Sequence, residues 1–585
     1  MKKLRLAFVA KSLNHVKQNL SSPLSDNIET WRTELQHDSD REFLLPGVAD
    51  GFHVTDENSH FCPAQAPNNK SALKYKAEVE KQIISEIDSG AYVCVSDKPT
   101  IISPLGADDR KKKIRVLHDG SQPSGGNLNS YATKNSFKYV TLDEATKLIP
   151  KNGYIAKVDI RHAYRSVGIH RNSIDAAGLQ WTFEGDVEPT TFVDTRLMFG
   201  ARKAPEIFQR ISNSVVRMMK RRGYIVISYL DDFLIIADNY LECLSGYHVL
   251  INLLESLGFT VSLDKCVSAC QKLTYLGVEI STVNRTLSLD NEKLETLHAD
   301  LAKWDGKKSA TKRELQQIIG RLSWAARVIR GGRTFLRRLI DLMASVKRKS
   351  HHTRINSSAR ADFLWWKNCV ESFNGSVYFL DENPLDPADY STDACNVGGA
   401  GYFQNDWFYV NWAVDYPDIA QKPIWMKELF TVLVSARRWA PFWKAKHVHV
   451  HCDNSPSVFM INKGTTKDAL AMSWLRELFW LSVKYEFYVT AKFISGKDNF
   501  LSDMISRMHD VDFMFKACLV LNMQPIVYNN GDFVFNVYNN MSYNSYTFLQ
   551  SVFRSGSGTN FSKNCFAIKE KLIQKIQRKL TVQCV

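Results

Sequence analysis

The chain has 585 residues, of which 44% are hydrophobic, so it can bury large cores and we expect several domains. A formal net charge of +14 favours a polyanionic partner such as nucleic acid. The eleven cysteines contain no CxxC pair, which argues against a disulfide scaffold or a zinc finger and indicates reduced thiols inside a cell.

The N-terminal segment MKKLRLAFVAKSL has an apolar stretch, Leu6 to Ala10, that Lys11 ends. This stretch is too short for a signal peptide, and no apolar run in the sequence reaches membrane-spanning length. We therefore expect an intracellular protein of the cytoplasm or nucleus, neither secreted nor in contact with a membrane. Proline and asparagine clusters at 63–69 predict that residues 1–70 form a loosely organised N-terminal extension.

Residues 71–285 have the pattern of an α+β domain. A helix is predicted from Lys74, with Val79, Ile83 and Ile87 on one face and Gly90 as its stop. Between 150 and 280, short apolar runs alternate with helical stretches.

Two adjacent acids, Asp231 and Asp232, interrupt the apolar run GYIVISYLDDFLIIADN. Each apolar half predicts a short buried strand, and the acids fall at the turn between the strands. Like charges repel and burial penalises both carboxylates, so a divalent cation would remove a cost that the pair otherwise carries. The alternative is a surface hairpin whose aspartates are only solvated.

A further acid, Asp159, follows an apolar approach in GYIAKVDIRHAYRSVGI. Phosphoryl transfer by two metals needs carboxylates that hold the cations about 4 Å apart. An acid on one strand and an Asp-Asp turn on a neighbouring hairpin would provide such a cage. Hard oxygen ligands favour two Mg²⁺ ions, with Mn²⁺ as a substitute.

These motifs resemble the fingers and palm of reverse transcriptases. The resemblance implies that Asp159, Asp231 and Asp232 bind the catalytic metals. It implies that Tyr164 is the aromatic gate that rejects a ribose 2′-hydroxyl. It also implies substrate contacts for Lys113 and Arg115 in a finger hairpin, Gly200 and Gln209 in LMFGARKAPEIFQR, Tyr229 beside the acids, and Lys265, the expected proton donor to pyrophosphate.

Three stretches, KIRVLHDGSQPSGG, AKVDIRHAYRSVGIH and GGRTFLRRLIDL, are similar to DIRS-type retrotransposons, which use a tyrosine recombinase. This resemblance covers about Trp31 to Arg507. It implies a separately encoded tyrosine recombinase and a Gag-like protein as partners. A polymerase from another retroelement branch is the alternative.

From Asn291 to about Lys349 the chain is helical and basic, with Leu315, Ile318 and Leu322 on one apolar stripe. The resemblance implies that residues 286–350 are the thumb. The arginines that would face duplex phosphates are Arg321, Arg327, Arg330, Arg333, Arg337 and Arg338. A solvated helix face would explain some of them equally well. The polar segment KRKSHHTRINSSAR predicts a linker or connection over 351–387.

Residues 388–510 contain four acids with a second characteristic spacing. Asp393 ends a strand, Glu428 lies on an amphipathic helix, Asp453 ends an alternating strand, and Asp503 lies in a helical start. Acids from two strands and two helices would form another two-metal cage. The set resembles the ribonuclease H fold, which implies that all four acids bind Mg²⁺.

One departure from that family concerns a histidine commonly placed before the last acid, where Phe493 and Ser495 stand here. Its loss would slow cleavage without abolishing metal binding.

Taken together, the sequence predicts an α+β multidomain fold. A right-hand polymerase with fingers, palm and thumb is followed by an α/β ribonuclease H-like domain and by a tail, 511–585, without an assigned role. The resemblance implies an RNA-directed DNA polymerase with ribonuclease H activity, acting on an RNA template, a DNA primer, dNTPs and an RNA/DNA hybrid. The alternative is a catalytically decayed or domesticated nucleic-acid-binding protein of retroelement origin.

Overall fold

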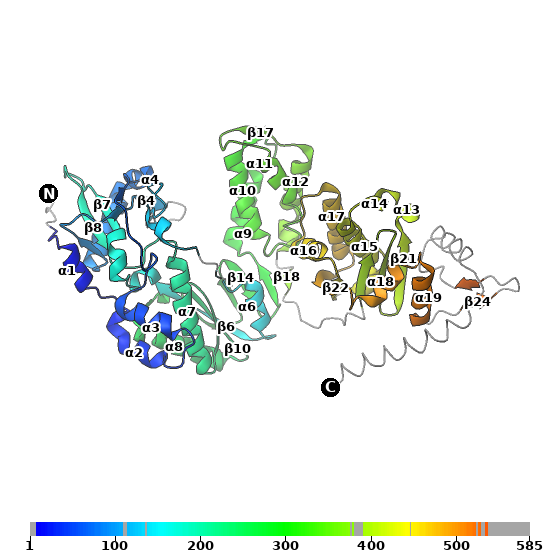
Figure 1. Cartoon of the computed structure of the whole chain (residues 1–585), viewed down its shortest axis with the longest axis horizontal. Helices are drawn as coiled ribbons and strands as arrows, with labels where there is room; N and C mark the ends of the chain where they lie inside the picture. The colour runs from blue at the N-terminus through cyan, green and yellow to red at the C-terminus, as the bar shows by residue number, and fades with distance from the viewer. Residues whose placement is uncertain are drawn as a thin grey trace. The chain divides into compact units, whose positions relative to one another are not determined.

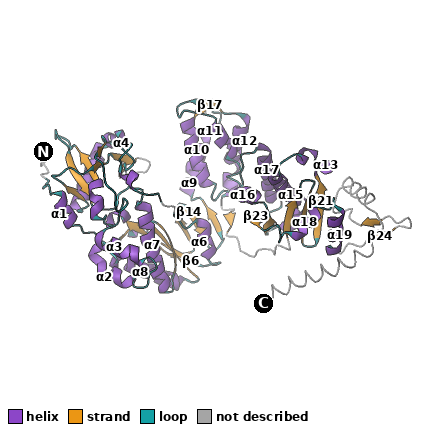
Figure 2. Ribbon diagram, in the orientation of Figure 1, coloured by secondary structure: helices purple, strands orange, loops and turns teal. Residues whose placement is uncertain are grey.

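The computed structural model describes residues 8–108, 114–134, 137, 139–374, 377–378, 390–444, 446–521, 525–527 and 533–535. The chain divides into two compact units, Met1–Asp290 and Asn291–Val585 (Figure 1). The predicted α+β multidomain class is confirmed, because each unit contains both helices and sheets (Figure 2).

The described helices of the first unit are α1 (Leu13–Gln18), α2 (Ile28–Glu34), α3 (Arg41–Asp50), α4 (Lys70–Lys74), α5 (Lys76–Asp88), α6 (Leu142–Leu148), α7 (Ala204–Arg221) and α8 (Tyr240–Ser256). Its described 3₁₀ turns are η1 (Ser25–Asn27), η2 (Leu128–Tyr131), η3 (Ala163–Ser166), η4 (Arg171–Ala176) and η5 (Leu263–Lys265). Its described strands are β1 (Ala64–Gln65), β2 (Tyr92–Cys94), β3 (Ile101–Ile102), β4 (Leu105–Asp108), β5 (Arg115–His118), β6 (Tyr154–Arg161), β7 (Gly178–Trp181), β8 (Thr190–Asp194), β9 (Ile225–Tyr229), β10 (Asp232–Ala237), β11 (Thr260–Val261), β12 (Val267–Cys270), β13 (Lys272–Tyr275), β14 (Val278–Ser281) and β15 (Thr286–Ser288).

The described helices of the second unit are α9 (Asn291–Ala302), α10 (Lys312–Ala325), α11 (Arg337–Ala344), α12 (Ser357–Phe373), α13 (Trp412–Asp415), α14 (Pro417–Ala420), α15 (Ile424–Trp439), α16 (Ser455–Lys463), α17 (Ala469–Lys484), α18 (Phe500–Ser506) and α19 (Val511–Val520), with a 3₁₀ turn η6 (Ala440–Trp443). Its described strands are β16 (Ser309–Thr311), β17 (His352–Arg354), β18 (Val377–Tyr378), β19 (Tyr390–Ala394), β20 (Gly398–Phe403), β21 (Asp406–Asn411), β22 (His447–Cys452), β23 (Tyr488–Phe493), β24 (Pro525–Val527) and β25 (Phe533–Phe535).

The N-terminal segment is integrated into the first unit, so the prediction of a loosely organised extension over 1–70 was wrong for residues 8–70. Trp31 on α2 is fully buried, and its indole Nε1 donates a hydrogen bond of 2.9 Å to the carbonyl of Leu257. Leu24, Leu35 and Leu44 join the same core. Because this partner lies 226 residues further along the chain, local composition carried no sign of the contact.

The predicted fingers region contains a five-stranded sheet in the order β1-β3-β7-β8-β2 and a separate antiparallel hairpin, β4–β5. The predicted helix with Val79 and Ile83 on its buried face is α5, which ends at Asp88. In the hairpin, Arg115 pairs directly with Asp108. The hairpin therefore places Arg115 at the start of a strand that runs back into the unit.

The predicted palm region contains a sheet in the order β11-β6-β10-β9, with β12 also paired to β6. Its two central strands carry the apolar residues that predicted buried strands, and Ile155, Phe233 and Ile235 are fully buried. Helices α7 and α8 pack against this sheet (Figure 2). The sheet fixes the acidic turn between β9 and β10 because both flanking strands are inside the core.

The predicted thumb region forms α9, α10 and α11, and the apolar stripe of α10 is buried as expected. The segment predicted as a linker is instead ordered structure over 352–373, where β17 pairs with β16 and α12 packs on α9 and α11. Trp366 on α12 is fully buried, and its Nε1 donates to the carbonyl of Phe335 (3.2 Å). The polar composition near 347–360 concealed this helix because the apolar residues follow only later.

The rest of the second unit is built on a mixed sheet in the order β21-β20-β19-β22-β23. Strands β19, β22 and β23 are parallel, and β20 is antiparallel to both of its neighbours, β19 and β21. On β21, Phe408 and Val410 pack into one core with α15 and α17. Trp407 and Tyr409, on the opposite face of the same strand, pack into another core with α18 and α19. This alternation covers both faces of the sheet with helices, as in the predicted α/β domain.

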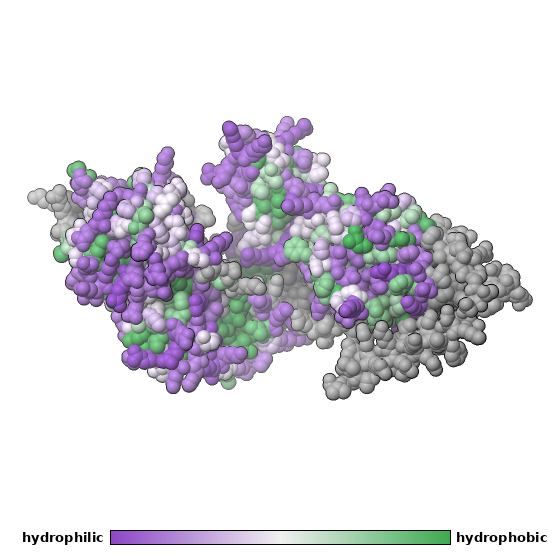
Figure 3. All heavy atoms as spheres, in the orientation of Figure 1, coloured by the Kyte–Doolittle hydropathy of each residue, from purple (hydrophilic) through white to green (hydrophobic). Residues whose placement is uncertain are grey.

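Among the described helices, none combines the length and the apolar composition that crossing a membrane requires. The face seen in Figure 3 is mostly hydrophilic, and its hydrophobic side chains gather only in small patches.

We predict that Trp31→Ala lowers the melting temperature of the first unit by about 10 °C, because it removes a large buried ring and a buried hydrogen bond. Differential scanning calorimetry of the full chain would measure the change. Leu241→Ala is the matched control, since Leu241 on α8 is 74% exposed and should shift melting by little. Equal melting of both variants would mean that the segment does not stabilise this unit.

Candidate active sites

The first acidic cluster is fixed by strand register. Asp159 on β6 pairs directly with Asp232 on β10, so both side chains leave the same face of the sheet. Asp231 occupies the turn, and its carbonyl accepts a hydrogen bond of 3.1 Å from the backbone N–H of Ile160. Asp159 is buried, while Asp231 and Asp232 are half-buried. The structure thus brings the three predicted acids together.

Two lysines provide the nearby positive charge. Lys265 Nζ lies 2.9 Å from Asp159 Oδ1, and Lys157 Nζ lies 3.0 Å from Asp232 Oδ1. Burial, followed by the charges of Asp232 and Asp159, raises the pKa of Asp231. The hydrogen bond to Asp159 raises the pKa of Lys265. The acids remain mutually repelling, which is the condition that favours a bound cation.

Helix α7 holds the acidic turn by hydrogen bonds to Leu230. Leu230 has a positive φ of 52°, and its backbone N–H donates to Gln209 Oε1 (2.9 Å). Its carbonyl accepts from Ser212 Oγ (2.7 Å). Gln209 is only 3% exposed, and its amide nitrogen donates to Asn213 Oδ1 (2.9 Å). Gln209, predicted to contact substrate, is thus bonded to the hairpin and to its own helix, which makes it a positioning residue.

An aromatic group lies beside the acids. Tyr164 stacks on Phe199, with ring centroids 4.8 Å apart, and burial raises its pKa. The guanidinium carbon of Arg115 lies 6.0 Å from the centre of the Phe199 ring, and Arg115 is exposed. Tyr229 packs against Tyr139 at 4.6 Å. The predicted substrate-contacting residues Arg115, Tyr164 and Tyr229 therefore come from fingers and palm; Lys113 lies outside the described residues.

Gly200 has a structural reason to be glycine. Its φ is +117°, and a Cβ there would lie 1.7 Å from the carbonyl oxygen of His118 at the end of β5. The neighbouring Phe199 carbonyl accepts a hydrogen bond of 2.9 Å from the His118 N–H. Gly200 therefore allows the finger hairpin to approach the segment that leads into α7.

The strand after the palm hairpin supports the same acids. Tyr275 is buried, and its hydroxyl donates to the carbonyl of Asp232 (3.2 Å). Burial and the charges of Asp232 and Asp231 raise the pKa of Tyr275. The sequence carried no signal for this hydrogen bond to the acidic turn.

The second acidic cluster gathers acids from β19, from α15, from the position directly after β22 and from α18. Asp393 and Glu428 are 3% and 2% exposed, and Asp453 is half-buried. Single ligand atoms of Glu428, Cys452 and Asp453 all lie within 4.8 Å of one another. The charges of Asp453 and Asp503 both act on Asp393. All four predicted acids therefore belong to one cluster.

Polar neighbours orient these acids. Ser506 Oγ donates to Asp393 Oδ2 (2.6 Å), and Asn499 Nδ2 approaches Asp393 Oδ1 at 3.4 Å. The backbone N–H of Ala394 donates to Glu428 Oε1 (3.1 Å). The sequence carried no signal for Asn499 or Ser506, although both lie within one turn of α18 from the predicted Asp503.

Burial dominates the electrostatics of the second cluster. It raises the pKa of Asp393 to about 7 and the pKa of Glu428 well above its usual range, and neighbouring carboxylates add to both shifts. The pKa of Asp453 is also raised, first by burial and then by Asp503. Arg507, whose Nε lies 2.8 Å from Asp503 Oδ1, is the cation that lowers the pKa of Asp393 and Asp453.

Both donor sets fit divalent cations. The first consists of carboxylates at the end of a hairpin, and the second of carboxylates with raised pKa values that a cation would lower. Cys452 is the exception, since its thiol donates to Glu428 Oε2 (3.6 Å) and burial raises its pKa. A protonated thiol is a poor ligand, so Cys452 would not displace the oxygen ligands.

The segment in which the ribonuclease H family commonly has a histidine is exposed at Phe493. Phe493, the last residue of β23, is 58% exposed, and Ser495 Oγ donates to Asp498 Oδ2 (2.6 Å). Neither side chain can transfer a proton as an imidazole does.

The arginines predicted to face duplex phosphates divide into two groups. Arg321, Arg337 and Arg338 form ion pairs with Asp300, Asp341 and Asp362, respectively, and Arg330 donates to Ser482 Oγ (2.8 Å) and to the Phe487 carbonyl. Arg327 and Arg333 are exposed. The prediction for Arg330 was wrong, because its guanidinium packs inside the second unit.

Comparisons with known proteins cover the region that contains the first acidic cluster. The profile of the family described as reverse transcriptase (RNA-dependent DNA polymerase) matches residues 113–280. The retrovirus-related Pol polyprotein from transposon 297 of Drosophila melanogaster is 24% identical over 277 residues, covering 47% of this chain and 25% of that protein. The Gag-Pol polyprotein of avian reticuloendotheliosis virus is 25% identical over 179 residues, covering 30% and 15%.

Among solved structures, the foamy viral protease-reverse transcriptase in complex with double-stranded DNA is similar, with a TM-score of 0.49 and 17% identity over 76% of this chain and 88% of that one. The chain spans a quarter or less of the first curated relatives that it matches. The chain thus carries a reverse transcriptase domain of the retroviral and retrotransposon Pol type.

We predict a pH dependence of stability for the second cluster. Asp393 titrates near pH 7 in the folded chain and near 3.8 when unfolded, so its stabilising contribution is fully present below pH 3.8 and is lost as pH rises through 7. Without divalent cations, the second unit should therefore melt at a lower temperature at pH 8 than at pH 6.

Asp393→Asn should weaken this dependence and raise the melting temperature at pH 8 by at least about 2–4 °C, the shift for roughly 1 kcal/mol. Calorimetry in EDTA would measure it. Asp418→Asn, at an exposed acid of the same unit, is the control and should leave the dependence intact. An unchanged dependence in Asp393→Asn would contradict the burial of this carboxylate.

Proposed function

We propose that the chain is an RNA-directed DNA polymerase joined to a ribonuclease H. The observation that carries the first activity is the direct pairing of Asp159 with Asp232 beside the turn that bears Asp231. Asp159 and Asp231 would be the main metal ligands, with Asp232 supporting them. When bound, two Mg²⁺ ions would stabilise the attacking and leaving oxygens of phosphoryl transfer.

The protein groups around the acids have separate tasks in this proposal. Arg115, with Lys113, would bind the triphosphate of the incoming dNTP. Tyr164, rigidly stacked on Phe199, would block a ribose 2′-hydroxyl. Lys265, whose ammonium is held beside Asp159, would give a proton to the leaving pyrophosphate. The primer 3′-oxygen would form the new bond to the α-phosphate as the bond to pyrophosphate breaks.

The second cluster would cut the RNA strand of an RNA/DNA hybrid. Asp393, Glu428, Asp453 and Asp503 would hold the divalent cations, and Ser506 and Asn499 would orient Asp393. The exposed Phe493 in place of a histidine favours slow product release. This feature is also the one that favours the alternative function, a decayed nucleic-acid-binding protein.

We also propose a DIRS-like origin, supported by the stretches KIRVLHDGSQPSGG, AKVDIRHAYRSVGIH and GGRTFLRRLIDL. In that case a tyrosine recombinase and a Gag-like protein would be encoded separately, and the chain would act inside the cell without a membrane partner. A recombinase reading frame beside the gene is expected, and an integrase frame would contradict this branch.

The two activities should separate by mutation. Asp231→Asn should reduce dNTP incorporation on a primed RNA template by at least about 100-fold, because it removes a ligand of the charged transition state. Asp453→Asn should spare incorporation and stop RNA cleavage. Primer extension and hybrid cleavage, each with and without Mg²⁺, would measure both effects.

Each variant is the control for the other, since both replace one carboxylate by its amide. Extension by Asp231→Asn at the unaltered rate would disprove the first site. Absence of Mg²⁺-dependent incorporation by the unaltered chain would favour the decayed protein instead.

A further inference from the structure

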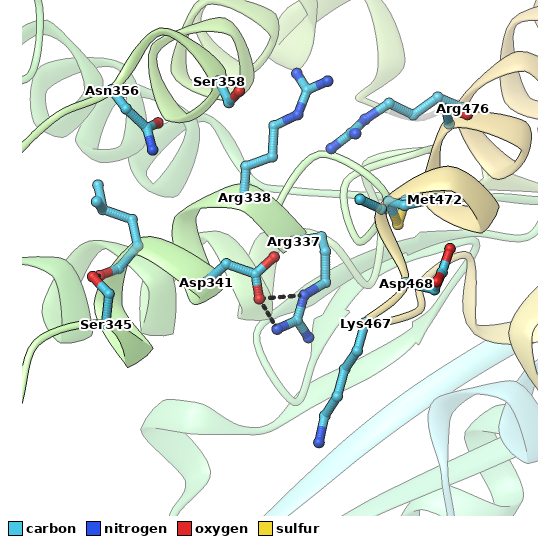
Figure 4. Close-up of a pocket in the computed structure, with 13 residues that line it drawn as sticks. Arg337, Arg338, Asp341, Ser345, Asn356, Ser358, Lys467, Asp468, Met472 and Arg476 are labelled. Carbon is cyan, nitrogen blue, oxygen red and sulfur yellow. Dashed lines mark hydrogen bonds and ion pairs between the residues drawn. The ribbon is translucent and has the colours of Figure 1, made fainter.

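A cavity of about 440 Å³ lies in the second unit, and none of the four acids of the second cluster lines it. Its walls come from α11, from the start of α12 and from the start of α17, as Figure 4 shows. Four cationic side chains line it: Arg337, Arg338, Lys467 and Arg476. The lining also contains two acids, Asp341 and Asp468, so the state of each charge decides what the cavity can bind.

Both lining acids are engaged by the protein. Asp341 forms an ion pair with Arg337, drawn as dashed lines in Figure 4. Asp468 caps helix α17, where its carboxylate accepts a hydrogen bond of 2.9 Å from the N–H of Ala471. Both acids keep their negative charges, so the four cations of the lining exceed its two acids by two.

Arg338 and Arg476 both pair with Asp362, a carboxylate that is not part of the lining. Asp362 is fully buried and lies 3.4 Å from Arg338 Nη1 and 3.3 Å from Arg476 Nη2. Burial raises the pKa of Asp362 to about 6 in spite of both arginines, which still leaves it mostly ionised at neutral pH. The two guanidinium groups face each other in Figure 4. One carboxylate thus balances two arginines.

Two donors are available for a ligand. Arg476 Nε is buried and has no hydrogen-bond partner among the residues that the structure describes. Lys467 is exposed and makes no ion pair within the described ranges. An anion in the cavity would lie near both cationic side chains and would offset the repulsion between Arg338 and Arg476.

We propose that this cavity binds a backbone phosphate of a nucleic-acid strand, an inference that rests on the proposed function. The lining contains no aromatic side chain on which a free nucleotide could stack its base. Arginine and lysine side chains around a phosphate oxygen are the usual sequence-independent contact. The site would hold the substrate strand in the second unit without taking part in the chemistry.

The test is the salt dependence of binding by the full chain to a fluorescent RNA/DNA hybrid in EDTA, measured by anisotropy. Lys467→Ala should lower the slope of log Kd against log salt by about 1, the value of one phosphate contact. Lys467→Glu should weaken binding at fixed salt by about fivefold or more. Unchanged affinity and slope in both variants would overturn the proposal.

Lys484→Glu is the matched control, because it makes the same charge change on an exposed lysine at the other end of α17, about 25 Å away. It should leave the slope near that of the unaltered chain, and an equal loss in both variants would overturn the proposal by showing a general charge effect. A second arm titrates dAMP and follows melting. If dAMP stabilises the unaltered chain but not the Lys467 variants, while hybrid binding is the same in all of them, the cavity is a nucleotide site. That result would overturn the proposal of a strand phosphate.

Primer extension and RNA cleavage by the unaltered chain, run alongside, keep the two proposals apart. Activity together with Lys467-independent binding would overturn only the cavity proposal. Inactivity together with Lys467-dependent binding would support the phosphate contact and reject the enzymatic function.

Discussion

Repulsion between clustered carboxylates is the constraint on which both candidate sites depend. Burial raises the pKa of Asp231 and of Asp393, and neighbouring carboxylates raise both further: Asp232 and Asp159 in the palm, and Asp453 and Asp503 in the second unit. The strands hold these groups together because register leaves them no alternative position. The repulsion is then released only by protons, by protein cations or by bound metal ions.

The two clusters meet this constraint differently. In the palm, Asp231 and Asp232 are half-buried, and lysines lie 2.9 Å from Asp159 and 3.0 Å from Asp232. Asp393 and Glu428 are almost fully buried, and the cation that acts on Asp393 is Arg507, which is paired with Asp503. The second cluster is therefore the one in which protonation and metal binding compete most directly near neutral pH.

Much of each site could be predicted because the acids stand at the ends of apolar runs, where strand patterns are plain. The supporting residues could not be predicted in this way. Gln209 and Ser212 reach the turn from a helix, and Ser506 reaches Asp393 over more than a hundred residues. Polar side chains of common types leave no pattern in a sequence, and their roles depend on packing that only the fold supplies.

The errors in domain organisation have the same origin. The segment before Lys70 contains prolines and polar clusters, yet Trp31 anchors it on Leu257. The polar stretch near 350 was read as a linker, yet it leads into α12, whose Trp366 is fully buried. In both cases a single large side chain with a distant partner outweighs the local composition.

The net positive charge of the sequence does not by itself identify which basic residues contact nucleic acid; the structure is needed for that. Arg330 is directed into the protein, and Arg321 and Arg337 are paired with acids of their own unit. An arginine whose charge is already matched gains less from a phosphate than one whose partner is weak or shared. The cavity lining together with Asp362 holds four cations and three acids, and this remaining positive charge therefore matters more for nucleic-acid binding than the number of basic residues in the region.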